Sequence, residues 1–95
     1  MNEAFGIVVD MRVCDGYIEY CRFFMNVGKD VAQDTFEQLL GLYDQGRDLP
    51  LRISLVRLNE LPYEILQVKY CRLDELAWNC RVITREIFKF YNLEP

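Results

Sequence analysis

The strictest constraint on the fold is a change of hydrophobic period that occurs twice along the chain. From Phe5 to Val13 a large apolar residue occupies every second position, which is typical of a strand with one buried face. Helical spacing follows after Asp30, and the same succession recurs after Pro50. This order predicts an α+β fold, a two-layer ββαββα arrangement in which a four-stranded, mainly antiparallel sheet carries two helices packed on one face.

Four segments have the strand pattern: about 5–13, 17–27, 51–58 and 63–72. Asp15-Gly16 separates the first two and predicts a hairpin, because glycine accepts positive φ at little cost. The last segment also fits a helical stripe, so the chain from Pro62 onward has a second interpretation as one long helix. The alternation of Leu66, Val68 and Tyr70 favours the strand.

The register of the first hairpin stays open at this stage. A two-residue loop pairs Val8 with Phe23, whereas a three-residue loop with Gly16 in a bulge pairs Ile7 with Phe23. Because a slip of one residue exchanges the two faces of a strand, the loop decides which side of residues 17–27 is buried. Under either register the second face keeps large apolar groups.

Two amphipathic helices are expected. The first begins at Asp30 as its N-cap, has Gln33 in the capping-box position and stops near Gly46. Its apolar stripe comprises Ala32, Thr35, Phe36, Leu39, Leu40 and Tyr43. The second runs from Asp74, also an N-cap, to about Tyr91. Its expected inward face comprises Leu76, Ala77, Cys80, Ile83, Ile87, Phe88 and Tyr91.

Composition limits the class of protein. Ninety-five residues, 52% of them hydrophobic, predict one α+β domain over 1–95. No segment approaches the ~20 apolar residues of a membrane span, and no secretory signal opens the chain, so we expect a cytoplasmic protein. The net charge of −4 disfavours a general electrostatic grip on nucleic acid. Residues 1–50 carry nine acids and four bases, whereas residues 51–95 carry six acids and seven bases.

Residues for catalysis or metal binding are scarce. The chain has no histidine, which removes the commonest general base and metal ligand. The four cysteines, Cys14, Cys21, Cys71 and Cys80, form no CxxC pair and match no zinc spacing. They are expected to be reduced thiols, and a cysteine cluster at 21, 71 and 80 is the minor alternative. Asp10 and Glu19 flank the first hairpin as solvated edges, with Arg12 as a cross-strand partner of Glu19. We therefore predict no catalytic residue, no metal and no cofactor.

The apolar side chains of the second strand predict a surface for a partner. With helices on one sheet face, the other face should be polar, yet the second and fourth strands each have large apolar groups on both faces. An exposed patch of this kind usually marks an interface. The candidate contact residues on the strand are Tyr20, Phe23, Phe24 and Met25.

A second candidate surface lies on the last helix. Arg81, Arg85 and Lys89 repeat at four-residue steps, with Trp78 one turn earlier. The sequence therefore predicts a small non-enzymatic interaction or regulatory module that forms a homo-oligomer or docks to a protein partner through the open sheet face. The alternative is a nucleic-acid-binding protein that uses this basic line.

Overall fold

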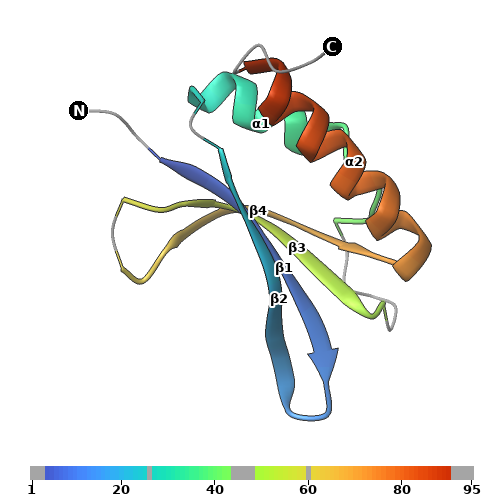
Figure 1. Ribbon diagram of the computed structural model, residues 1–95. Coiled ribbons are helices and arrows are strands. Elements are labelled where there is room, and N and C mark those ends of the chain that lie inside the picture. Colours follow the sequence, from blue (N-terminus) through green and yellow to red (C-terminus); the bar gives the residue numbers. More distant parts are fainter. Residues whose placement is uncertain (1–3, 26, 44–48, 60, 91–95) are drawn as a thin grey trace.

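The computed structural model describes residues 4–25, 27–43, 49–59 and 61–90. In chain order the elements are β1 (Phe5–Val13), β2 (Gly16–Met25), α1 (Lys29–Glu37), β3 (Leu51–Arg57), β4 (Glu64–Cys71) and α2 (Leu73–Phe90). The strands form one open sheet in the order β2-β1-β3-β4, and every neighbouring pair is antiparallel (Figure 1). The predicted α+β class, with four antiparallel strands and two helices, is confirmed. The long-helix alternative from Pro62 onward is wrong, because residues 64–71 pair with β3.

The first hairpin has the register of the three-residue loop away from the turn, but its loop is Cys14-Asp15, one position before the predicted Asp15-Gly16. Ile7 lies opposite Phe23, as the three-residue loop predicts. At the turn, however, Val13 lies opposite Gly16, so that only two residues form the loop. Gly16 adopts a φ of 139°, a conformation that side chains with a Cβ rarely take.

A β-bulge reconciles the two ends of this hairpin. The register shifts between Val9 and Asp10, where Tyr20 is left without a partner on β1. The extra residue reverses the alternation of β2 between the bulge and the turn, so that side chains there point to the opposite face from the one that simple alternation predicts. Ile18 consequently shares a face with Phe23, although simple alternation places the two on opposite faces.

One face of the sheet supplies the core. Its buried strand residues join buried side chains of both helices in a single cluster. The members are Phe5, Ile7, Val9, Met25, Val27, Ala32, Phe36, Leu39, Leu51, Ile53, Leu55, Cys71, Val82 and Ile83. In Figure 1 the helices lie next to each other, and the tip of the β1–β2 hairpin extends away from them.

Helix α1 is displaced and shortened relative to the prediction. It begins at Lys29, its N-cap is Gly28, and no side chain caps it, so the predicted capping role of Asp30 is wrong. Asp30 lies instead in the first turn, where a carboxylate favours the helix dipole. The helix ends at Glu37, before the expected stop at Gly46, which lies outside the described residues.

A buried lysine explains the early end of α1. Nζ of Lys69, on β4, donates hydrogen bonds to the carbonyl oxygens of Phe36, Glu37 and Leu39 at 2.8, 3.3 and 2.8 Å. The last carbonyls of a helix lack partners within the helix, and a cation there also favours its dipole. Burial lowers the pKa of Lys69, and the Glu37 carboxylate acts in the opposite direction.

Further bonds fix the segment that follows α1. The buried side chain of Asn79 accepts from the Leu40 N–H at 2.7 Å and donates to the Leu40 carbonyl at 2.9 Å. Leu42 then forms an isolated antiparallel bridge with Tyr70. Gly41 is required between them: its φ is 154°, and a Cβ there would lie 2.9 Å from the Tyr70 carbonyl oxygen.

Helix α2 occupies the predicted region, but the residues that face the core differ in part from those that the sequence predicts. It starts at Leu73, and the Glu75 carboxylate accepts from the backbone N–H of Arg72 at 2.9 Å, so Asp74 is not the N-cap. Ala77 and Phe88, both predicted inward, are exposed. Val82 and Asn79 are buried in their place, and Tyr91 lies outside the described residues. Neither helix in the described part of the chain has the length and apolar character of a membrane span.

Candidate functional site

The candidate site is the sheet face that points away from the core, together with the edge strand β2. Pairing positions define this outer face, because residues opposite one another in an antiparallel pair share a face. Across β2, β1, β3 and β4 it includes Phe24, Arg22, Glu19, Tyr17, Val8, Asp10, Arg52, Ser54, Val56, Ile65 and Val68.

Charged side chains cover the middle of the outer face. Arg52 donates from Nε and Nη2 to Oδ2 of Asp10, at 3.2 and 3.1 Å, and its guanidinium lies 3.9 Å from the centre of the Tyr17 ring. On the same face, Val8 and Val56 are buried. The centre of this face is therefore not the open apolar patch that the sequence predicts.

A second charged group extends across the sheet from β2. Arg22 donates to the Tyr63 hydroxyl, and its guanidinium lies 4.6 Å from the centre of that ring. Nη2 of Arg22 also bonds the Glu19 carboxylate at 2.7 Å, and this bond raises the pKa of Arg22. Since β2 and β4 are opposite edges of the sheet, these contacts bridge its whole width.

A shallow depression lies between the two charged groups. Its volume is about 220 Å³, and Val8, Asp10, Glu19, Arg52, Ser54, Val56, Tyr63 and Ile65 line it. Its carboxylates already hold arginine partners: Asp10 bonds Arg52, and Glu19 bonds Arg22. The predicted partner of Glu19, Arg12, is wrong, because the bulge brings Arg12 opposite Tyr17.

The candidate contact residues of β2 separate into two groups. Tyr20 is 58% exposed and Phe24 67% exposed, and Ile18, absent from the prediction, is 53% exposed. Phe23 packs partly buried against the core, and Met25 is fully buried within it. Met25 therefore belongs to the core and is not available to a partner.

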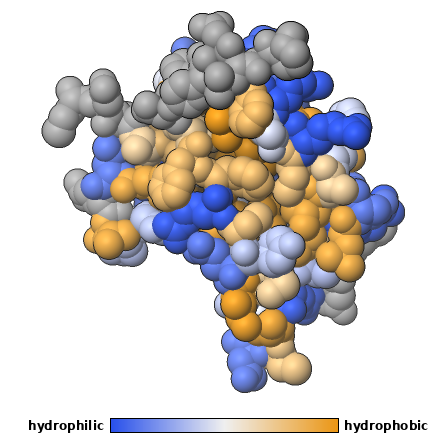
Figure 2. Space-filling view, viewed as in Figure 1, coloured by the Kyte–Doolittle hydropathy of each residue, from blue (hydrophilic) through white to orange (hydrophobic). Residues whose placement is uncertain are grey.

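The projecting hairpin extends this apolar surface. Met11, Val13 and Ile18 share the face that, nearer the body, is covered by the core, and all three are exposed. Figure 2 shows hydrophobic surface on this hairpin below the body of the molecule. β1 pairs with β3 as far as Met11, so only the tip of the hairpin beyond Met11 is two-stranded.

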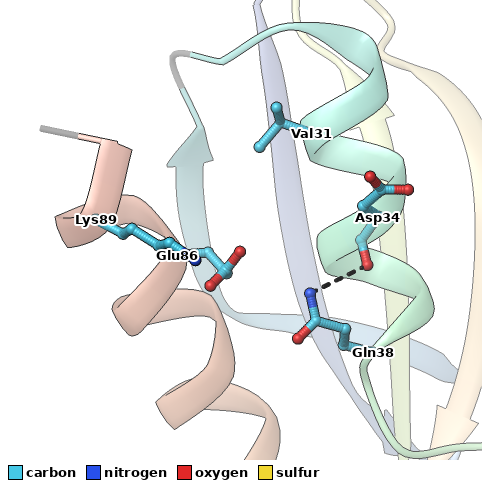
Figure 3. A pocket seen from close by; sticks show the side chains of 5 residues that line it. All are labelled: Val31, Asp34, Gln38, Glu86 and Lys89. Carbon is cyan, nitrogen blue, oxygen red and sulfur yellow. Dashed lines mark hydrogen bonds between the residues drawn. The ribbon is translucent and has the colours of Figure 1, made fainter.

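The four candidates on α2 remain on its solvent side. Trp78 is 44% exposed, and Arg81, Arg85 and Lys89 are all exposed. Arg85 lies 3.8 Å from the Glu86 carboxylate. Lys89 instead borders a depression of about 370 Å³ between α1 and α2, lined also by Val31, Asp34, Gln38 and Glu86 (Figure 3).

Burial controls the chemistry of the cysteines. It raises the pKa of Cys71 to about 11, with a smaller contribution from Glu75, and it also raises the pKa of Cys21 and Cys80. Thiols in this state stay protonated at neutral pH, whereas a nucleophile or metal ligand must be a thiolate. Within the described ranges no three cysteine, aspartate or glutamate side chains are arranged to hold a metal ion.

Thiol labelling follows from these environments. With iodoacetamide at pH 7.4 we expect the exposed Cys14 at the hairpin turn to be alkylated first and the buried Cys71 to be protected, because a buried, protonated thiol is a poor nucleophile. Peptide mass spectrometry over a time course measures this order. Labelling in urea, where all four sites should react, is the control, and rapid modification of Cys71 in the native protein would contradict the prediction.

The charged groups of the outer face escaped the sequence interpretation. Tyr63 precedes β4 and is predicted only as a strand residue, and the contact of Arg22 with Glu19 depends on a bulge that alternation does not reveal. The single available signal was the excess of arginine and tyrosine on predicted strands.

Comparison with known proteins adds no assignment. No protein-family model, no curated protein and no solved structure matches the chain. The function is therefore inferred from this surface.

Proposed function

We propose that this chain is a small non-enzymatic protein-interaction module that self-associates through its sheet. The proposal takes the fold as two layers, with both helices packed on one face, and places the contact with a second copy along the edge strand β2. One observation carries it: Ile18, Tyr20 and Phe24, all more than half exposed, are apolar side chains on the same edge strand.

The contact surface that we propose differs in position from the one that the sequence indicates. Arg22 and Arg52, with their partners, cover the middle of the outer face. Apolar surface is left along β2 and on the projecting hairpin, where a second copy would remove it from water. Fully burying a phenylalanine side chain contributes about 1.5–3 kcal/mol, and this contribution opposes the free-energy cost of association.

Replacing Phe24 with serine is expected to weaken self-association at least about tenfold, because the interface loses its most exposed aromatic side chain on the sheet. Sedimentation equilibrium over a concentration series measures the dissociation constant. Leu73→Ser is the matched control, since Leu73 is 68% exposed, comparable with Phe24 at 67%, but lies at the start of α2. A wild-type protein that stays monomeric at 100 micromolar would refute the proposed self-association.

The exposed face of α2 supports nucleic-acid binding as a second candidate function. Trp78 and Arg81 are exposed there, and in the described part of the chain none of the ion pairs includes Arg81. Binding to a mixed oligonucleotide pool that weakens steeply with salt would favour this function over the first.

A further inference from the structure

The outer edge of β2 is the longest unpaired edge of the described sheet. β2 spans ten residues and is the first strand in the sheet order, so its outer backbone groups face no other described strand. Such an edge can pair with another chain, and natural sheets usually protect it with lysine, proline or a bulge. β2 has a bulge but neither lysine nor proline, and its exposed residues include Ile18 and Phe24.

The bulge decides which side chains of β2 point to each face of the sheet, and it does so differently before and after Tyr20. Before it, Tyr17 and Glu19 point to the outer face, and Ile18 points to the core face. After it, Arg22 and Phe24 point to the outer face, and Phe23 points to the core face. An antiparallel partner must bring residues of the same face opposite one another.

We propose that two copies of the chain pair through β2 in antiparallel orientation, about a two-fold axis between Tyr20 and Cys21. This inference rests on the proposed self-association and specifies its geometry. Glu19 of each copy then lies opposite Arg22 of the other. The two four-stranded sheets become one continuous sheet of eight strands.

Matching faces select this register. The two-fold axis brings Ile18 opposite Phe23 on the core face and Tyr17 opposite Phe24 on the outer face, so that every pair outside the bulge shares a face. A shift by one residue places outer-face groups opposite core-face groups. A shift by two keeps the faces but separates Glu19 from Arg22, which loses the charge pairing.

The bulge does not obstruct this arrangement. It normally discourages edge pairing because it interrupts the ladder of backbone hydrogen bonds. In a two-fold pair both copies have it next to the axis, so the two interruptions coincide and the segments on either side stay regular. Identical patches that contact each other across a two-fold axis are the commonest arrangement of homodimers.

Charge reversal tests the register. Glu19→Arg makes both positions basic, and Arg22→Glu makes both acidic, so each variant repels itself and should self-associate at least tenfold more weakly than wild type. An equimolar mixture of the two variants should form a heterodimer with near wild-type affinity, measured by sedimentation equilibrium. The pair within each chain, 2.7 Å in the wild type, remains broken in both variants, so only contacts between chains can produce this recovery.

Each outcome separates the register from the proposed function. If wild type dimerises but the mixed variants associate no better than either alone, the register is wrong and the self-association stands. If wild type is monomeric, both fail. Arg72→Glu, an exposed position outside the sheet, is the control and should leave dimerisation unchanged.

Hydrogen exchange of the wild type tests the same contact without any variant. The β2 amides should become more protected as the concentration rises through the dissociation constant. Unchanged protection of β2 in a proven dimer would overturn the edge pairing.

Discussion

Replacing Lys69 with methionine is expected to lower the free energy of unfolding by about 3 kcal/mol, the largest loss expected from any single charged residue in this sheet. The ammonium group donates to three carbonyl oxygens at the end of α1 and is almost fully buried. Methionine has nearly the same length but no donor, so these carbonyls lose their partner while they stay shielded from water. An unsatisfied buried polar group costs about 1–3 kcal/mol, and part of this is offset because the charge no longer needs to be buried.

Urea unfolding followed by circular dichroism measures the loss. Lys29→Met is the matched control, because Lys29 is exposed at the start of α1, and its substitution should change stability by less than about 0.5 kcal/mol. Equal stability of the Lys69 variant and wild type would mean that the carbonyls find other partners, and the account of the helix end would then be wrong.

The sequence predicts those parts of the fold that depend on local periodicity. Alternation locates all four strands to within a few residues. In β4, however, it indicates the wrong buried face: Lys69 and Cys71 are buried, whereas Val68 and Tyr70 lie on the outer face. Helix α2 was also found, because its apolar residues recur over several turns. Part of its inward face was missed because Asn79, a polar residue, occupies a buried position that a hydrophobic stripe cannot reveal.

The end of α1 was not predictable from local pattern. Leu39, Leu40 and Tyr43 continue the helical spacing, yet the helix ends at Glu37 because Lys69, more than thirty residues away in sequence, binds the final carbonyls. A lysine on a strand usually indicates a solvent-facing position, so the sequence gives no sign of this contact.

The sequence predicts the apolar character of the candidate site but not which of its residues are exposed. Apolar residues of β2 were correctly recognised as too numerous for one buried face, but the bulge at Tyr20 decides which of them are exposed. Simple alternation places Ile18 and Phe24 together, whereas the bulge separates them onto opposite faces. The arginine contacts across the outer face likewise depend on strand order, which local pattern does not contain.

Replacing Asn79 with aspartate is expected to cost about 3 kcal/mol of unfolding free energy at pH 7.5 and much less near pH 4. The amide accepts from the Leu40 N–H and donates to the Leu40 carbonyl, and its side chain is fully buried. A protonated carboxyl group has the same shape and can make both bonds. A carboxylate can only accept, so it would face the carbonyl oxygen without a proton between them.

The sign of the pH dependence follows from this geometry. Burial beside a carbonyl oxygen raises the pKa of the introduced carboxyl group above its value in the unfolded chain, about 3.9. The unfolded chain then loses its proton first as the pH rises, so the variant loses stability from about pH 4 upward until the folded form also ionises.

Urea unfolding of the variant and wild type at each pH measures the difference between them. Asn59→Asp is the control: Asn59 is exposed, and its Oδ1 accepts from the Ala4 N–H at 3.0 Å, a bond that a carboxylate oxygen also accepts, so this change should alter stability by less than about 0.5 kcal/mol at either pH. A loss at position 79 of the same size at both pH values would contradict the two-bond account and point to packing alone.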